Sequence, residues 1–267
     1  MNTTEFLNIT SLIVPDRTAI VFDGKRFSFQ ELEERVKKLA NALAGMGVKA
    51  GDRIASMQVN CNENIETYFA AAKLDAVYVP LNFRSRPEEI EYMINDSKPK
   101  ILITGERYVS MVDGIKENLT SVDGFVVMDD ASAEGWESYE QLLSTSSGED
   151  MYPLGAEDDL TMVMFTAGTT GSPKGVMLSH DSFASYLLAN VSPPDLESEE
   201  KNILTVPLYH IAGVQAVMAA IYGGRTLIIQ RQFEPVEWMT LVQEEKANRA
   251  MMVPTMLKML MDHQEFE

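Results

Sequence analysis

The sequence predicts an α/β fold with largely parallel sheets flanked by helices. Runs that read as strands alternate with helical patterns of ten or more residues, and this alternation needs crossover connections between parallel strands. The strand-like runs are continuously apolar, as expected of strands that are buried on both faces. The chain has 267 residues, of which 45% are hydrophobic and 23% are charged. This length suffices for one large domain or two modest ones.

The first clear element is a helix that begins after a capping box. Ser28 suits the N-cap and Glu31 the third helical position, where each side chain can accept a hydrogen bond from the other residue's backbone N–H. Gly45 and Gly47 end the pattern, since glycine is common just beyond a helix. Apolar residues carry the helical spacing: Leu32, Val36, Leu39, Ala40 and Leu43.

The remaining elements continue the alternation to the end of the sequence. Pro87 suits the first turn of a helix, because its missing N–H would have no intrahelical partner there. Strand-like runs cover residues 53–59, 76–81, 100–104, 125–128, 160–166, 176–179, 202–206, 225–230 and 249–253. Helices are expected over residues 62–74, from 87, over 183–190, over 212–222, between 231 and 248, and from 254.

The pattern weakens over residues 129–159, where the Ser-Thr-Ser-Ser-Gly run at 144–148 is the most linker-like part. We therefore expect two α/β subdomains, residues 1–150 and residues 151–267. The five methionines between Met251 and Met261 are interpreted as core residues. As core residues they need a partner layer that this chain lacks.

Composition argues against several classes of function. A formal net charge of −18 disfavours sequence-independent binding to nucleic acid and docking on an anionic membrane, because both need a basic face. Cys61 is the only cysteine, so no intrachain disulfide can form, and nothing near it in sequence marks it as a nucleophile. The sequence has no secretory signal and no apolar run of transmembrane length, so we expect a cytoplasmic protein.

The segment between residues 166 and 175 suits the binding of phosphate. Its glycines allow backbone N–H groups to turn toward a ligand, and its hydroxyls can donate to phosphate oxygens. Lys174 adds a positive charge, and Pro173 stiffens the approach to it. The glycines are Gly168, Gly171 and Gly175, and the hydroxyl residues are Thr166, Thr169, Thr170 and Ser172.

This segment differs from two common phosphate-binding patterns. A Walker loop places Gly before Lys and Ser or Thr after it, whereas Lys174 lies between Pro173 and Gly175. No Gly-x-Gly-x-x-Gly fingerprint of dinucleotide-binding proteins follows a strand. From composition alone, a hairpin that merely links two strands remains an alternative.

Residues 165–176, Phe-Thr-Ala-Gly-Thr-Thr-Gly-Ser-Pro-Lys-Gly-Val, resemble the phosphate-binding motif of the adenylate-forming superfamily. This superfamily includes acyl- and aryl-CoA synthetases, luciferases and the adenylation domains of peptide synthetases. The Thr-Thr-Gly-x-Pro-Lys-Gly core is intact. Ala167 stands where serine is usual, which removes one hydroxyl.

Three further segments resemble the family in the expected order. Residues 28–54 are similar to its early helix and the Gly-Asp-Arg entry to a strand. Residues 71–82 resemble the next helix-to-strand turn, with Asp75 where most relatives have glycine. Residues 206–213, Val-Pro-Leu-Tyr-His-Ile-Ala-Gly, are similar to the second core motif. The resemblance covers nearly the whole chain and implies an incomplete large N-terminal domain of an adenylate-forming enzyme.

The resemblance also implies roles for individual residues. Thr166 would help to bind Mg²⁺, and Lys174 would neutralise the β- and γ-phosphates of ATP. His210 would lie at the wall between the acyl pocket and the thiol tunnel; without the resemblance it would be an ordinary buried polar group. His180 is interpreted as a structural or surface histidine. The phosphates would be cradled by Thr166, Ala167, Gly168, Thr169, Thr170, Gly171 and Ser172.

The implied reaction is the ATP- and Mg²⁺-dependent activation of a fatty or aromatic acid as acyl-AMP, followed by thioester formation with coenzyme A. Such chemistry depends on positioning and charge neutralisation more than on covalent catalysis. The implied partners are therefore small molecules, namely the acid, ATP and coenzyme A. Family members are often dimeric, so a homodimer is also implied, although no residue marks an interface.

Several segments that the family uses are missing from this sequence. They are the Tyr-Gly-x-Thr-Glu segment, whose glutamate binds Mg²⁺, the Thr-Gly-Asp segment that holds the ribose, and the C-terminal lid with its adenylating lysine. We therefore expect an N-terminal fragment that does not turn over alone. Two alternatives stay open: an amino-acid adenylation domain, which residues 207–213 disfavour, and a short protein that only binds phosphate or a partner.

Overall fold

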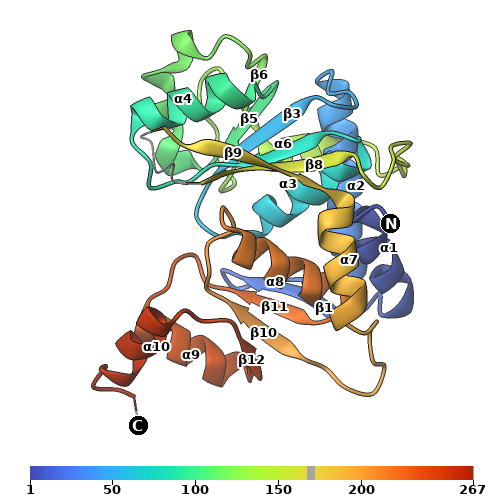
Figure 1. Ribbon diagram of the computed structural model, residues 1–267, viewed down its shortest axis with the longest axis vertical. Helices are drawn as coiled ribbons and strands as arrows, with labels where there is room; N and C mark the ends of the chain where they lie inside the picture. Colours follow the sequence, from blue (N-terminus) through green and yellow to red (C-terminus); the bar gives the residue numbers. More distant parts are fainter. Residues whose placement is uncertain (167–171, 267) are drawn as a thin grey trace. The chain divides into compact units, whose positions relative to one another are not determined.

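The computed structural model describes residues 1–166 and 172–266 (Figure 1). The chain forms two compact units, each built around its own sheet. The first unit contains Met1–Thr4, Glu34–Gln58 and Glu63–Ala184, and the second contains Glu5–Glu33, Val59–Asn62 and Ser185–Glu267.

The first unit holds a seven-stranded sheet in the order β7-β6-β5-β3-β4-β8-β9. Every neighbouring pair is parallel except β8 and β9, which form an antiparallel hairpin. Its strands are β3 (Arg53–Met57), β4 (Val77–Pro80), β5 (Ile101–Thr104), β6 (Gly124–Val127), β7 (Glu137–Ser138), β8 (Leu160–Thr166) and β9 (Lys174–Ser179). Its helices are α3 (Asn62–Lys73), α4 (Pro87–Ser97), α5 (Val109–Asp113) and α6 (Tyr139–Thr145), with 3₁₀ turns η1 (Glu106–Tyr108) and η2 (Lys116–Asn118).

The second unit holds a five-stranded sheet in the order β12-β10-β11-β1-β2, in which only β1 and β2 are antiparallel. Its strands are β1 (Thr18–Phe22), β2 (Lys25–Ser28), β10 (Lys201–Leu204), β11 (Thr226–Ile229) and β12 (Arg249–Ala250). Its helices are α1 (Thr4–Ile13), α8 (Ile211–Tyr222), α9 (Pro235–Glu245) and α10 (Pro254–Met261). Helices α2 (Phe29–Gly45) and α7 (His180–Asn190) have residues in both units.

The inner strands of both sheets are buried on both faces, as the continuously apolar runs predict, whereas the edge strands β2, β9 and β12 carry exposed residues. Successive residues of a strand point to opposite faces, and both Leu227 and Ile228 of β11 are fully buried. The same holds for Leu102 and Ile103 of β5. In the second unit, Ile228 belongs to a core cluster against which α9 packs. The predicted class, an α/β fold with mostly parallel sheets flanked by helices, is confirmed.

Helices α2 and α4 begin at the residues that the local sequence predicts. The Ser28 N–H donates to the Glu31 carboxylate at 2.7 Å, and the Glu31 N–H donates to the Ser28 hydroxyl at 3.1 Å. These two bonds form the predicted capping box. Pro87 occupies the first turn of α4, where no intrahelical N–H is required. In the described part of the chain, no helix is both long and apolar enough to cross a bilayer.

The predicted boundary at residue 150 does not separate the two units. Strands β8 and β9 follow residue 150 but belong to the same sheet as β3. Strands β1 and β2 precede residue 150 but belong to the same sheet as β10, β11 and β12. Ile20 of β1 lies opposite Leu227 of β11 in parallel register. Pairing between strands so distant in sequence leaves no trace in local hydrophobicity, and therefore the sequence pattern misses it.

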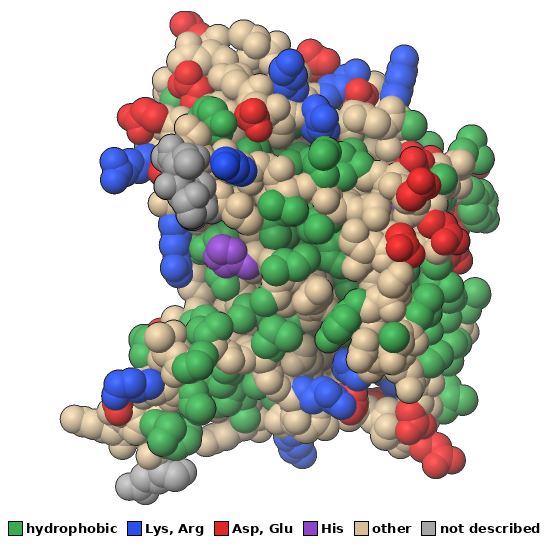
Figure 2. All heavy atoms as spheres, viewed as in Figure 1, with side chains coloured by type: hydrophobic (Ala, Val, Ile, Leu, Met, Phe, Trp, Pro, Cys, Tyr) green, Lys and Arg blue, Asp and Glu red, His purple; other side chains and the backbone are tan. Residues whose placement is uncertain are grey.

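One smaller expectation also differs from the structure. Ser144 and Thr145, which we interpreted as linker, end α6, and each hydroxyl donates to the Gln141 carbonyl at 2.9 Å. The core role of the methionines near the C-terminus stays a prediction: Met259 and Met261 are 51% and 62% exposed, as expected of residues whose partner layer is absent from this chain. Only Leu260 of α10 is buried, and Figure 2 shows hydrophobic side chains on the surface over this helix.

Candidate functional site

The segment that resembles a phosphate-binding loop follows the carboxyl end of β8. This strand pairs in parallel with β4, and ligands of α/β sheets commonly bind beyond the carboxyl ends of parallel strands. Thr166 at the end of β8 lies opposite Lys174 at the start of β9. Thr166, Ser172 and Lys174 are all exposed. Ala167, Gly168, Thr169, Thr170 and Gly171 lie outside the described residues.

Strand β8, which leads into the loop, is buried. Met162, Val163, Met164 and Phe165 of β8 are buried, so the strand is fixed on both faces. Gly175 lies opposite Phe165, and a Cβ at this position would come within 2.9 Å of the Val163 side chain. A side chain at residue 175 would therefore displace the Val163 side chain.

The described donors of this loop are available to a ligand. The Thr166 hydroxyl lies 3.5 Å from the Lys174 carbonyl oxygen, at the long limit of a hydrogen bond. Lys174 forms no ion pair with another described residue. Lys174 thus carries an exposed positive charge on a chain whose net charge is −18.

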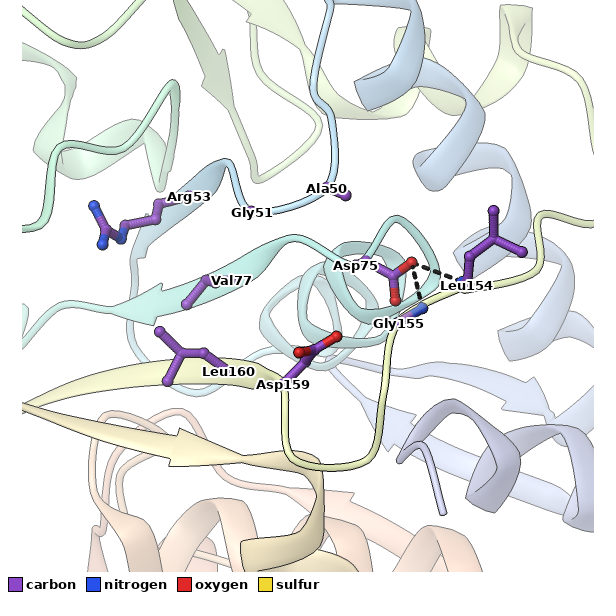
Figure 3. A pocket seen from close by; sticks show the side chains of 9 residues that line it. All are labelled: Ala50, Gly51, Arg53, Asp75, Val77, Leu154, Gly155, Asp159 and Leu160. Atoms are coloured by element: carbon purple, nitrogen blue, oxygen red, sulfur yellow. Dashed lines mark hydrogen bonds between the residues drawn. The ribbon is translucent and has the colours of Figure 1, made fainter.

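Asp75 fixes the segment that leads into β8. It lies in the turn between α3 and β4 with a φ of 52°, a left-handed conformation that explains why glycine is usual at this position. Its carboxylate accepts hydrogen bonds from the N–H groups of Leu154 at 2.7 Å and Gly155 at 3.1 Å (Figure 3). The departure from glycine therefore adds a tether to the chain that enters the hairpin.

A pocket of about 470 Å³ lies beside this tether. Figure 3 shows the carboxylates of Asp75 and Asp159 close to Gly155, from the α3–β4 turn and from the start of β8. Asp159 accepts from the Ala156 N–H at 2.7 Å. Both carboxylates therefore serve the backbone of residues 154–156, and we assign this pocket a structural role.

In the second unit, His210 lies beyond the carboxyl end of β10 and forms the N-cap of α8. Its N–H donates to the Pro207 carbonyl at 3.1 Å, and its carbonyl accepts from the Gly213 N–H at 3.0 Å. The ring of His210 is 4.4 Å from the ring of the buried Tyr209. The His210 side chain is exposed, contrary to the buried position that the sequence alone indicates.

Asn60, which the sequence analysis did not single out, holds the turn before His210. It follows β3, belongs to the second unit and is 2% exposed. Its amide donates to the carbonyls of Val206 at 3.1 Å and Gln230 at 3.2 Å, and it accepts from the Leu208 N–H at 3.0 Å. In the sequence, the signal for Asn60 is its polar side chain, which directly follows the apolar strand-like run at residues 53–59.

His180 and Cys61, which the sequence also brings into question, are buried side chains with structural roles. His180 is 2% exposed, and its Nδ1 lies 2.9 Å from the Thr3 hydroxyl. Cys61 is buried, as is usual for a cysteine that serves as a small apolar residue. The described residues contain no cluster of three or more His, Cys, Asp or Glu that could hold a metal ion.

Hydroxyl oxygen is a ligand that Mg²⁺ accepts when phosphates supply further oxygens. Thr166, exposed at the start of the loop, fits this requirement as one ligand. Figure 2 shows Lys and Arg side chains mostly scattered over the face that it draws, without one broad basic area among the described residues there.

Comparison with known proteins matches residues 13–267 to the family described as AMP-binding enzyme. Indoleacetate–CoA ligase of Aromatoleum aromaticum is 30% identical over 265 residues, which are 97% of this chain and 51% of that protein. A long-chain-fatty-acid–CoA ligase of Mycobacterium tuberculosis is 30% identical over 244 residues, which are 90% of this chain and 47% of that protein.

Among solved structures, the inhibitor-bound N-terminal domain of FACL13 from Mycobacterium tuberculosis matches with a TM-score of 0.89 at 26% identity. The match covers 99% of this chain and 66% of that one. The chain thus has the fold of about two thirds of that N-terminal domain. It spans about half the length of the curated relatives that it matches.

Proposed function

This chain belongs to the family of AMP-binding enzymes, and on that basis we propose that the protein is an acid–CoA ligase. The supporting observation is the pairing of Thr166 with Lys174 at the carboxyl end of β8, within a sequence typical of the family's phosphate loop. Because the chain spans about half the length of its relatives, the proposal concerns the activity of the whole protein. Residues 1–267 alone are proposed not to turn over.

In this proposal the hairpin binds the β- and γ-phosphates of ATP. Lys174 contributes charge, while Thr166, Thr169, Thr170 and Ser172 contribute hydroxyls, and the glycines leave the backbone N–H groups accessible. Thr166 would be one ligand of Mg²⁺. The ion, when bound, supplies the charge neutralisation that allows a carboxylate to approach the triphosphate.

The proposed reaction has two steps. A carboxylate oxygen of the acid attacks the α-phosphorus of ATP, the bond to the β-phosphate oxygen breaks, and pyrophosphate leaves. The sulfur of coenzyme A then attacks the acyl carbon, AMP leaves, and the thiol proton passes to solvent or a base. Such reactions are accelerated by positioning of the reactants and by neutralisation of the phosphate charge, more than by covalent catalysis.

The acid is proposed to be apolar, either fatty or aromatic. Two relatives are named for indoleacetate and for long-chain fatty acids, and His210 is proposed to lie at the wall of the acyl pocket. Its neighbours favour an apolar ligand, because Tyr209 packs beside the imidazole and Ile211 is 41% exposed. A charged or strongly polar acid would have to lose its hydration against these side chains.

The test is pyrophosphate release by the whole protein with a panel of acids, in the presence and absence of coenzyme A. Release that depends on an apolar acid, with thioester formed only when coenzyme A is present, supports the proposal. Release with amino acids alone would favour an adenylation domain instead. Acid-dependent exchange between ATP and pyrophosphate by residues 1–267 would contradict the proposal that this part is inactive alone.

A further inference from the structure

Asn60 joins the ends of two neighbouring parallel strands. Its side-chain nitrogen donates to the Val206 carbonyl, which follows β10, and to the Gln230 carbonyl, which follows β11. The Asn60 backbone N–H also donates to the Arg231 carbonyl at 3.1 Å. One buried residue therefore fixes the chain beyond both carboxyl ends.

The bonds to Asn60 lie on either side of Pro207. Proline has no N–H, and the Val206 carbonyl and the Leu208 N–H flank it on its two sides. Asn60 binds both, at 3.1 and 3.0 Å. This arrangement needs two N–H donors and an acceptor on one short side chain, and only an asparagine amide offers that combination at this length.

The turn is in direct contact with the start of α8. The Pro207 carbonyl accepts from the His210 N–H at 3.1 Å. A Cβ added to Gly213 would lie 2.3 Å from the same Pro207 oxygen, so the first turn of α8 rests against Pro207. A shift of residues 206–208 must therefore move His210.

We propose that Asn60 is a positioning residue for His210. It holds residues 206–208 in the conformation that places His210 at the N-cap of α8. The consequence for acid binding rests on the proposed function, in which His210 borders the acyl pocket. The positional part of the inference does not depend on that function and is measured separately.

The positional part is tested by NMR of the imidazole signals. The chain has three histidines, and a His210→Gln variant assigns the signal of His210. In Asn60→Ala this signal shifts or broadens, while the signals of His180 and His263 stay in place. The matched control is Asn64→Ala, because Asn64 is also buried, follows the same strand and bonds instead to Ser56. An unmoved His210 signal in folded Asn60→Ala, or an equal shift in Asn64→Ala, overturns the proposal.

If Asn60→Ala does not fold, hydrogen exchange in the unaltered protein tests the role of Asn60. The Leu208 N–H has the buried Asn60 oxygen as its acceptor, so its hydrogen exchange is expected to be slow. Exchange of Leu208 at the rate of an open loop would overturn the proposal. Protection of this amide supports it.

The catalytic part is tested by steady-state kinetics of the whole protein. In Asn60→Ala, kcat/KM for the acid is expected to fall roughly tenfold to a hundredfold, as small misplacements of a binding group do, while KM for ATP is unchanged. An unchanged kcat/KM beside a moved His210 signal would overturn the link from position to reaction. If the unaltered protein activates no acid, the proposed function fails, and the NMR result still decides the role of Asn60.

Discussion

The hydroxyl of Thr3 lies 2.9 Å from Nδ1 of His180, although 177 residues separate the two in sequence. The same hydroxyl lies 2.6 Å from the hydroxyl of Tyr68. All three residues are buried. Burial lowers the pKa of His180 to about 4, and the N-terminal amine also lowers it, against the opposing effect of Asp75 and Asp159. The imidazole is therefore neutral at pH 7 and ties the N-terminal segment to the start of α7.

Stability of the first unit should fall as the pH drops below 6.5. The pKa of His180 is lower in the folded chain, about 4 against 6.5, so the unfolded chain binds the additional proton in this window. The contribution of His180 is thus complete above pH 6.5 and is lost as the pH falls toward 4. Between pH 7 and pH 5 the loss should be roughly 2 kcal/mol, measured by urea unfolding.

Carboxylates titrate in the same range, so the effect of His180 is obtained by difference. The His180→Gln variant should show a smaller loss between pH 7 and pH 5 than the unaltered protein. His263→Gln serves as the control, because His263 lies in the other unit, and its pH dependence should match that of the unaltered protein. Equal losses in all three proteins would show that His180 is not protonated on unfolding.

Truncation of Arg35 should destabilise the first unit severely. Its guanidinium bonds to the fully buried Glu66 at 2.8 and 3.1 Å and to Glu140 at 2.6 Å. Tyr139 also donates to Glu66, at 2.8 Å. Arg35→Ala leaves the Glu66 carboxylate buried without its cationic partner, which costs about 3–5 kcal/mol. The free energy of unfolding in urea measures this loss.

The control is an ion pair of similar length on the surface. Lys258 and Asp262 approach to 2.7 Å but are 75% and 61% exposed. Lys258→Ala should leave stability unchanged, because solvent and salt screen such a pair. A loss in Arg35→Ala no larger than in Lys258→Ala would mean that the Arg35 cluster is solvated.

Two substitutions of Asp75 separate the contribution of backbone conformation to stability from that of hydrogen bonding. Asp75→Gly keeps a residue that tolerates a φ of 52° but removes the acceptor of the Leu154 and Gly155 N–H groups. Asp75→Ala loses the acceptor and also strains the backbone, so it should be about 1 kcal/mol less stable than Asp75→Gly. Hydrogen exchange at Leu154 and Gly155 should accelerate equally in both variants. Unchanged exchange would show that the tether is not formed in solution.

Signals within a few residues predict much of this fold. The Ser28–Glu31 capping box and Pro87 mark the starts of two helices, and their bonding needs nothing from distant residues. Asp23 and Gly24, both with positive φ, join β1 and β2 through a two-residue turn that the sequence also signals. That hairpin is absent from the sequence prediction because β2 is mostly polar and forms no apolar run.

Features that depend on distant residues could not be predicted in the same way. The division into units follows from the pairing of β1 with β11, and nothing near either strand encodes it. The phosphate-loop residues form one contiguous motif and are found readily from sequence. Asn60 acts on Leu208 and Gln230, which are distant in sequence, so its role emerges only from the folded chain.

Removal of the Lys174 charge should weaken the binding of ATP more than that of AMP. The ammonium is proposed to contact the β- and γ-phosphates, which AMP lacks. Loss of a charge-assisted hydrogen bond should raise the Kd of Mg·ATP about tenfold or more in Lys174→Ala, with the Kd of AMP unchanged. Calorimetry of the whole protein measures both, and Lys174→Arg should retain part of the ATP affinity. An equal effect on both nucleotides would place Lys174 away from the terminal phosphates.

Substitution of Gly213 should show that α8 rests directly on the turn before His210. A Cβ at Gly213 would lie 2.3 Å from the Pro207 carbonyl oxygen and 2.9 Å from its carbon, both of them backbone atoms. Gly213→Ala should therefore cost about 1–3 kcal/mol, because the helix must move outward.

The matched control for Gly213→Ala is Gly45→Ala, at the last residue of α2, where an added Cβ would meet no atom within 4 Å. Gly45→Ala should be neutral or up to about 1 kcal/mol more stable, since alanine is the better helix former. Urea unfolding compares the two variants. Equal stability would mean that α8 and Pro207 are further apart in solution, and that the turn does not transmit its position to His210.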